Sequence, residues 1–427
     1  MTKRIKEETI LFLTVIKWVF LSIVVGMIVG GGTVVFLKSL NWAIAAAGRF
    51  WYAFLFLPLI FFLSSLIVTH LAPDAKGHGT EKVIEAIHKK NGHINIMVVP
   101  VKLLATVITI AFGGSAGKEG PCAQIGAGLA SFFADIFRFD DFDRRKLVIC
   151  GISAGFAAVF GTPIAGAIFG VEVLFVGSVM YDVLLPSFIA GIVGYHTASA
   201  LGIIYAFYPI NIIPDFGAQF FLEVLLSGAF FGIISFLLIE ILSAGEDLAA
   251  RIRWYSPFKG LLGGGVLALL AVIFSQQYLG LGLDTVKSSL TGGEMFWYTP
   301  VLKMIFTSVT LAFGGSGGII TPIFFVGASS GSFFGSLLHL DPVVFAAIGF
   351  VAVLAGAANT PIAASIMAVE MFGPSIAPYA ALACVVSFIM TGHRSVYSSQ
   401  ILAFKKSKLL DVSLGGEIDK VDVRFKE

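Results

Sequence analysis

Two short motifs combine glycine with a following proline, as is typical of a helix start. Residues 117–121 read GKEGP and residues 318–322 read GIITP. Proline is favoured in the first helical turn, where its missing N–H costs no hydrogen bond. A helix start presents unpaired N–H groups and a partial positive charge, and glycine lets a ligand approach the backbone closely. The two motifs therefore predict anion-binding helix starts, and GHG at 77–79 predicts a third. Together they could hold an anion without a full positive charge, weakly enough for it to leave.

Glu119 places a carboxylate within the turn that should attract an anion. It can occupy the anion site itself, and its protonation would then free the site, so that Glu119 would act as a gate and as a proton carrier. Alternatively, Glu119 complements the helix dipole or pairs with Lys118. The residue types leave both interpretations open.

Glu172 and Glu370 lie at matching places late in two apolar segments. Each could relay protons, but a carboxylate in both segments is better explained as an acceptor of backbone or hydroxyl hydrogen bonds that stabilises the fold. The seven histidines and three cysteines show no metal-ligand spacing. No metal site and no disulfide framework are predicted.

The elements that must position these residues are duplicated. Three pairs of segments match in the same order: 77–87 with 280–290, 109–121 with 310–322, and 162–172 with 360–370. The offsets are nearly constant, at 203 (280 − 77), 201 (314 − 113) and 198 (360 − 162) residues. These matches predict two repeats, residues 9–207 and 214–403. Repeats in transporters commonly have opposite orientations, with the binding site at their interface near the middle of the membrane.

The composition excludes a soluble domain. Of the 427 residues, 57% are hydrophobic and only 13% are charged, about half the charged share of an ordinary soluble protein. We expect an all-α polytopic membrane protein with about 10 to 15 membrane-embedded helices. A net charge of +2 without a basic stripe argues against a nucleic-acid partner.

Basic residues at both ends predict the orientation. Three of them lie at 3–6, before the first apolar segment, and three lysines lie at 405–408, after the last. By the positive-inside rule both termini are expected in the cytoplasm, and we predict an inner (plasma) membrane protein of a prokaryote. Residues 1–427 are then a single transmembrane anion-transport domain in membrane lipid, ending in a short cytoplasmic tail at 404–427.

The motifs resemble the signatures of the CLC family of chloride channels and chloride/proton antiporters. GKEGP at 117–121 is similar to the second family signature, GGIITP at 317–322 to the third, and SVYSSQIL at 395–402 to the tyrosine-bearing segment. The ordered motifs span about residues 77–402. The resemblance implies a CLC-type fold of two inverted repeats with many tilted and broken helices. It also implies a homodimer with one pathway per subunit, and bound chloride ions with no other cofactor.

Carried over residue by residue, the resemblance makes Glu119 the external gating and proton-accepting glutamate. The N–H groups of Glu119 and Gly120 would serve an outer anion site, and those of Ile319 and Ile320 a central site. Tyr397 would supply an inner hydroxyl and form the inner mouth with His78. The candidate anion-binding residues are Gly77, His78, Gly79, Gly117, Lys118, Gly120, Gly318, Ile319, Ile320, Thr321 and Tyr397.

Three positions depart from the family pattern. His78 stands where the first signature usually has a chloride-contacting serine. Val173 stands where the antiporters often have a second, internal proton glutamate, and Ile320 where an aromatic residue is frequent. The departures leave the anion preference open and weaken the expected proton coupling.

The expected function is transmembrane anion transport with chloride preferred, channel-like or weakly coupled to protons and gated by Glu119. A fluoride/proton antiporter of the same family is the alternative. We rank it second because that branch is expected to carry a carboxylate in the third signature, where residues 318–320 are apolar. An intramembrane serine protease is a distant alternative suggested by GGSG at 314–317, but it would need a histidine base on a neighbouring helix. Because GGS recurs at 113–115, we expect Ser115 and Ser316 to be packing residues, with no catalytic role.

Overall fold

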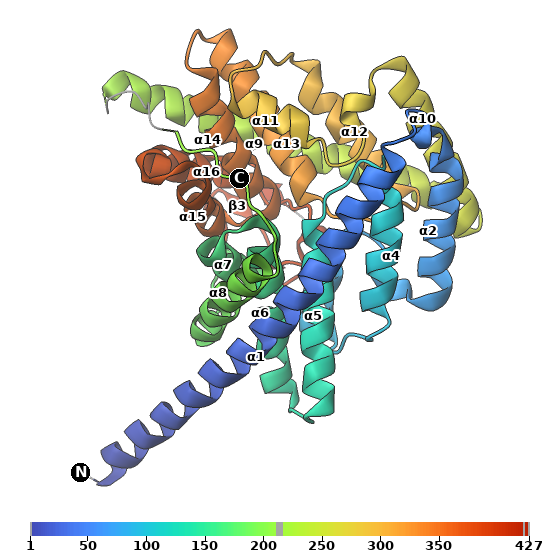
Figure 1. Cartoon of the computed structure of the whole chain (residues 1–427). Coiled ribbons are helices and arrows are strands. Elements are labelled where there is room, and N and C mark those ends of the chain that lie inside the picture. Colours follow the sequence, from blue (N-terminus) through green and yellow to red (C-terminus); the bar gives the residue numbers. More distant parts are fainter. Residues whose placement is uncertain (1, 211–216, 422, 426–427) are drawn as a thin grey trace.

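The computed structural model describes residues 2–210, 217–421 and 423–425. These residues form sixteen α-helices and four two-residue strands, which confirms the all-α prediction (Figure 1). The helices of the first half are α1 (Thr2–Ala47), α2 (Leu57–Leu71), α3 (Thr80–Lys89), α4 (Val98–Ala111), α5 (Glu119–Ile136), α6 (Asp141–Phe160), α7 (Pro163–Glu172) and α8 (Leu184–Ala200). Those of the second half are α9 (Ala218–Arg251), α10 (Ser256–Ile273), α11 (Leu283–Leu290), α12 (Tyr298–Ala312), α13 (Ile320–Leu337), α14 (Pro342–Ala358), α15 (Pro361–Phe372) and α16 (Ala377–Met390). The strands are β1 (Phe175–Val176), β2 (Ile401–Leu402), β3 (Leu410–Asp411) and β4 (Arg424–Phe425).

Six helical segments are long and apolar enough to cross a membrane, as expected of a polytopic membrane protein. They are Lys3–Ala47, Ala53–Leu71, Tyr181–Ala200, Ala218–Arg251, Ser256–Ile273 and Ile320–Leu337. Other apolar helices, such as α4 and α7, have only 14 and 10 residues. A helix rises about 1.5 Å per residue, so these are too short to span the hydrocarbon core of about 30 Å alone. Short helices inside a membrane are tolerated where their ends face protein or a water-filled cavity.

Turn residues divide apolar segments that are continuous in composition. The apolar stretch at 145–178 is divided between α6 and α7, because Gly161 takes a left-handed conformation (φ 77°) and Pro163 opens the next helix. In the second half, Asn359 takes the same conformation (φ 55°) and Pro361 opens α15. The stop and start signals are thus duplicated along with the apolar pattern.

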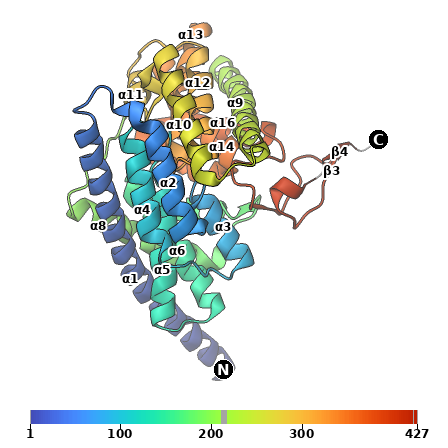
Figure 2. The ribbon, with the colours of Figure 1, turned by 90° about the vertical axis from the view of Figure 1, so that its right-hand side faces the viewer.

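The sixteen helices form two sets of eight that are arranged alike. In the first set α1 packs against α8 and α5 against α6, and in the second set α9 packs against α16 and α13 against α14. The sets interlock where α2 packs against α10 (Figures 1 and 2) and α7 against α15 (Figure 1). This is the fold of two inverted repeats that the sequence predicts. The repeat boundaries themselves stay predictions, and the expected start at residue 214 lies outside the described residues.

Helix α1 is longer than a membrane crossing requires. Its 46 residues extend about 69 Å at 1.5 Å per residue, and its N-terminal part projects from the body (Figure 1). The distance from Trp18 to Trp42 along the helix is about 36 Å, between the thickness of the hydrocarbon core (about 30 Å) and that of the bilayer with its headgroups (about 40–45 Å). Trp18 is buried, whereas Trp42 is exposed.

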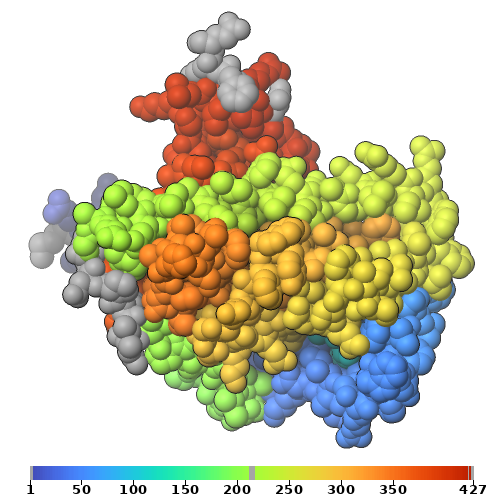
Figure 3. Space-filling model, turned by 90° about the horizontal axis from the view of Figure 1, so that it is seen from above, coloured from blue at the N-terminus to red at the C-terminus, as the bar shows by residue number. Residues whose placement is uncertain are grey.

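The segment after residue 400 lies partly against the helical body. β2 pairs with β1 in parallel, and β3 pairs with β4. Val412 and Ile418 pack with Val176 and Phe388, while the outer part projects from one face (Figure 3). The expected cytoplasmic tail therefore has contacts with the membrane domain, although its last residues, 426–427, lie outside the described part of the chain.

Candidate anion pathway

The three predicted helix starts meet at one point. Gly117 and Gly318 form an antiparallel bridge in which each N–H donates to the other's carbonyl, at 2.7 and 2.6 Å. A Cβ atom on Gly120 would lie 2.0 Å from the His78 carbonyl oxygen. Only glycine permits such approach of three backbones. The predicted residues 77–79, 117–120 and 318–321 are therefore neighbours, with Lys118 and Ile319 directly preceding α5 and α13.

The Glu119 carboxylate crosses from the first repeat to the helix start of the second. Its Oε2 accepts a hydrogen bond from the Thr321 N–H at 3.0 Å, and its Oε1 accepts from the Thr321 hydroxyl at 2.5 Å. Glu119 is only 1% exposed. A carboxylate at the N-terminus of α13 stands where a free anion would bind. Of the two interpretations of Glu119, this geometry supports occupation of the anion site by its own side chain.

The end of the site at His78 and Tyr397, which the resemblance predicts to be the inner one, is marked by polar atoms that lack a partner. Among the described residues, His78 Nδ1, Thr80 Oγ1, Glu81 Oε2 and Tyr397 Oη are buried without a hydrogen-bond partner. The His78 and Tyr397 rings lie 6.2 Å apart, and Tyr397 is fully buried. Buried polar groups are rarely left unpaired unless water or a ligand satisfies them. The predicted pairing of His78 and Tyr397 is thus present, and Thr80 and Glu81 are additions that the motifs did not indicate.

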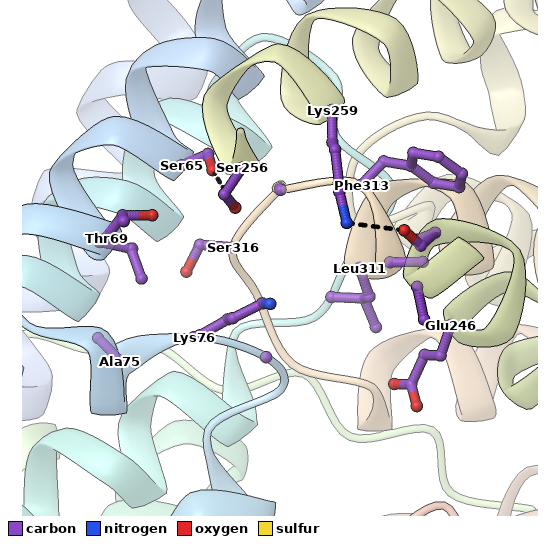
Figure 4. A pocket seen from close by; sticks show the side chains of 17 residues that line it. Ser65, Thr69, Ala75, Lys76, Glu246, Ser256, Lys259, Leu311, Phe313 and Ser316 are labelled. Atoms are coloured by element: carbon purple, nitrogen blue, oxygen red, sulfur yellow. Dashed lines mark hydrogen bonds between the residues drawn. The ribbon is translucent and has the colours of Figure 1, made fainter. Parts of the chain in front are cut away.

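Two cavities border this inner end. One, of about 560 Å³, is lined by His78, Glu81 and Ser398, among others. The second, of about 280 Å³, shares Lys76, Gly77 and Glu246 with the first. In Figure 4 Ser316 lies on the wall of the second cavity, and the Lys259 ammonium donates to the Ala249 carbonyl at 2.8 Å. Acidic and basic side chains both line the cavity that contains His78.

A buried lysine lies next to the predicted helix start at 77–79. Lys102 is completely buried, and its Nζ donates to the carbonyls of Ala75 (3.2 Å) and Gly77 (2.5 Å). Lys303 is equally buried and binds the carbonyls that correspond to these in the second repeat. The carbonyl groups satisfy each ammonium, so the lysines hold the loops before α3 and α11. The recurrence of lysine at the repeat offset (303 − 102 = 201) is the feature of the sequence that indicates this structural role.

Glu172 and Glu370 cap helices of the opposite repeat, which confirms their structural interpretation. Glu172 accepts from the N–H groups of Ile362 and Ala363 at 3.0 and 2.8 Å, at the start of α15. Glu370 accepts in the same way from residues 164 and 165 of α7, both at 2.9 Å. Neither carboxylate contacts Glu119 or Thr321 directly. Val173 is fully buried, and an apolar side chain cannot carry a proton.

The repeated serines also bond across the repeats. The Ser115 hydroxyl lies 3.0 Å from that of Thr307, and the Ser316 hydroxyl lies 3.0 Å from that of Thr106. No histidine is among the described residues that line the cavity beside Ser316. The geometry therefore gives Ser115 and Ser316 the packing role that their repetition predicts.

A membrane protein of two interlocked repeats, with helix starts, a carboxylate and a tyrosine converging on a buried site, has the organisation of an anion transporter. The chain belongs to the voltage gated chloride channel family, whose sequence model matches residues 60–392. Accordingly, it is a multi-pass membrane protein that transports anions.

Similar proteins and structures agree with this assignment. The chain is 36% identical over 407 residues to the chloride/fluoride channel protein of Pseudomonas syringae pv. tomato, covering 94% of this chain and 90% of that one. It is 28% identical to the voltage-gated ClC-type chloride channel ClcB of Salmonella typhimurium, over 75% of this chain and 79% of that one. Among solved structures, a CLC-type fluoride/proton antiporter is similar with a TM-score of 0.86 and 28% identity, covering 90% and 98% of the two chains. A cyanobacterial Cl⁻/H⁺ antiporter shares the fold, with a TM-score of 0.74 and 20% identity over 88% and 94%.

Proposed function

We propose that this protein exchanges fluoride for protons across the membrane. The names of two similar proteins include fluoride, and they favour the fluoride alternative over the chloride preference expected from the third signature. The observation that carries the proposal is the Glu119 carboxylate held by both donors of Thr321, at 3.0 and 2.5 Å. Fluoride is the strongest hydrogen-bond acceptor among the halides, and a site whose donors bind a compact oxygen anion suits it chemically.

The same contact couples the anion to the proton. When Glu119 is charged, its oxygens use the Thr321 donors, and an anion must compete with it. When Glu119 is protonated, its hydrogen bonds weaken and the side chain can leave the helix start, so the anion takes its place. Return of the deprotonated carboxylate expels the anion. Each cycle thus moves a proton on Glu119 and an anion through the site in linked steps.

Chloride is the second candidate for the transported anion. Residues 318–320 supply no carboxylate, and another similar protein is named a chloride channel. In this case Tyr397, His78 and the helix starts would bind a larger anion, and the apolar Val173 would leave transport channel-like or weakly coupled to protons.

We further propose that the protein is a homodimer in the plasma membrane with both termini in the cytoplasm. The exposed apolar side chains on helices such as α9 and α10 suit lipid and a second copy. The basic residues near both ends support the orientation. Bound anions are the only ligands proposed, and nucleic acid is not a proposed partner. Cross-linking in the membrane and accessibility of cysteines placed near each terminus test assembly and orientation.

The transported anion is tested by reconstitution into liposomes loaded with fluoride or chloride, with anion efflux read by ion-selective electrodes and internal pH read by a dye. We expect faster fluoride efflux, accompanied by proton uptake against the proton gradient. Chloride efflux faster than fluoride efflux would instead support the second candidate. Cation movement without anion movement would contradict both.

A further inference from the structure

The carboxylate of Glu81 is bonded on one side only. Its Oε1 accepts three hydrogen bonds, from the Ser398 hydroxyl at 2.8 Å and from the N–H and hydroxyl of Ser399 at 3.0 and 2.5 Å. Its Oε2 is buried and has no partner among the described residues. A buried carboxylate oxygen without a donor is costly unless it binds water or carries a proton itself.

The partners of Glu81 are neutral, unlike those of the neighbouring acids. Glu85 pairs with Lys82 at 2.7 Å, and Glu240 pairs with Arg394 at 3.0 Å. Glu246 lies 3.6 Å from His78 Nε2. A cation partner stabilises only the charged carboxylate, whereas a serine hydroxyl can donate to a carboxylate or accept from a carboxylic acid. Glu81 can therefore hold its place in both protonation states.

Glu81 lies between water and the anion site. It lines the cavity of about 560 Å³, and its serine partners directly follow Tyr397 in the chain. The buried Thr80 and Tyr397 hydroxyls, which neighbour Glu81 and Ser398 in the chain, have no partner among the described residues. Glu81 thus borders the cavity and is joined through Ser398 to the segment that carries Tyr397.

The position in the helix does not explain these contacts. Asp284 occupies the corresponding place of α11 (81 + 203 = 284), so an acid in the first turn is common to both repeats and suits the helix dipole. Asp284, however, is exposed to solvent, whereas Glu81 reaches the tyrosine segment. What differs between the repeats is therefore the contact with residues 398 and 399.

We propose that Glu81 is the inner proton-exchange group of this transporter, in place of a carboxylate at Val173. This rests on the proposed proton-coupled function. A proton from cavity water binds the Glu81 carboxylate, and the acid then passes the proton to the charged Glu119 by way of the unpartnered hydroxyls or water between them. Glu81 returns to a carboxylate and Glu119 becomes an acid, so charge and protons balance. The other charged or titratable groups around the cavity are Lys76, His78, Lys82, Glu240, Glu246, His393, Arg394 and Asp419.

The test compares proton and anion movement in the same liposomes for the whole protein and three variants. Glu81→Gln keeps the size and the hydrogen bonds to the serines but cannot carry a proton. Glu81→Asp keeps a carboxylate. Glu85→Gln, one turn further along α3, is the matched control.

We expect Glu81→Gln to keep anion flux while anion-driven proton movement falls to that of protein-free liposomes. Glu81→Asp should retain measurable coupling, and Glu85→Gln should behave like the unchanged protein. Wild-type coupling in Glu81→Gln would overturn the role of Glu81 and leave the proposed function intact. Loss of anion flux in both Glu81 variants would also overturn it, because it would indicate a structural role. Absence of coupled proton movement in the unchanged protein would refute the proposed function, and this inference with it.

Discussion

Replacement of Glu119 by glutamine tests the central contact of the pathway. The glutamine oxygen can accept from the Thr321 N–H and its amide can donate to the Thr321 hydroxyl, so both bonds persist but the charge is lost. A hydrogen bond to a charged group contributes about 1.5–3 kcal/mol and a neutral one about 0.5–1.5 kcal/mol. The two bonds of Glu119 would therefore weaken by about 1 kcal/mol each, or about 2 kcal/mol together. A change of about 1.36 kcal/mol corresponds to a factor of ten. The ratio of molecules in which the side chain of residue 119 has left the site to those in which it occupies the site should therefore rise about thirtyfold.

The expected phenotype of Glu119→Gln is anion flux without pH control. In the unchanged protein, lowering the external pH protonates the carboxylate and frees the Thr321 donors, so anion flux should rise as external pH falls. In the variant there is no proton to bind, so flux should be high at every external pH and proton movement should stop. The assay is anion efflux from liposomes at a series of external pH values, with Glu85→Gln as the control. A variant that folds but keeps the pH dependence of the unchanged protein would refute this account of Glu119.

Three further predictions concern the inner mouth, the helix caps and the tail. His78→Ser should preserve transport and shift the preference among chloride, nitrate and fluoride, and an unchanged selectivity series would show that His78 faces away from the path. Glu172→Gln and Glu370→Gln should each lower the free energy of unfolding by about 2 kcal/mol, because each weakens two charge-assisted bonds to a helix start. Widely different unfolding temperatures of the two variants in detergent would contradict the equivalence of the two caps. Hydrogen bonds from Lys420 and Lys89 lower the pKa of Glu417, so its contribution to holding residues 404–421 is present above the ordinary glutamate pKa. It is lost as pH falls through the lowered value, and hydrogen exchange of this segment should then increase, whereas Lys89→Gln should make the segment exchange faster at neutral pH.

The sequence predicts the fold well because its signals are local and occur twice. Glycine and proline mark the helix starts, apolar composition marks the membrane segments, and constant offsets pair the repeats. These signals also locate Glu119 and Tyr397. They do not reveal that Glu172 reaches α15 or that Glu81 reaches residues 398 and 399, since such contacts join positions about 190 and 317 residues apart and depend on how the repeats interlock. The carbonyl partners of the buried lysines are equally unpredictable, because a lysine in an apolar segment gives no indication of which carbonyls satisfy it.

Comparison of the two repeats distinguishes residues with a structural role from those expected to act on the anion or the proton. The buried lysines, the capping glutamates and the bonded serines occur in both repeats with equivalent partners, as expected of groups that maintain a shared framework. Glu119 has no such counterpart: Ile320 corresponds to it (119 + 201 = 320), and Gly120 corresponds to Thr321. The framework therefore provides two similar helix starts, those of α5 and α13. Only the start of α5 carries an acid, Glu119, and it bonds Thr321 at the start of α13, so there is a single carboxylate contact. An anion that enters from either side of the membrane is therefore expected to meet the same carboxylate, so that a single residue, Glu119, would gate a site that the duplicated halves build together.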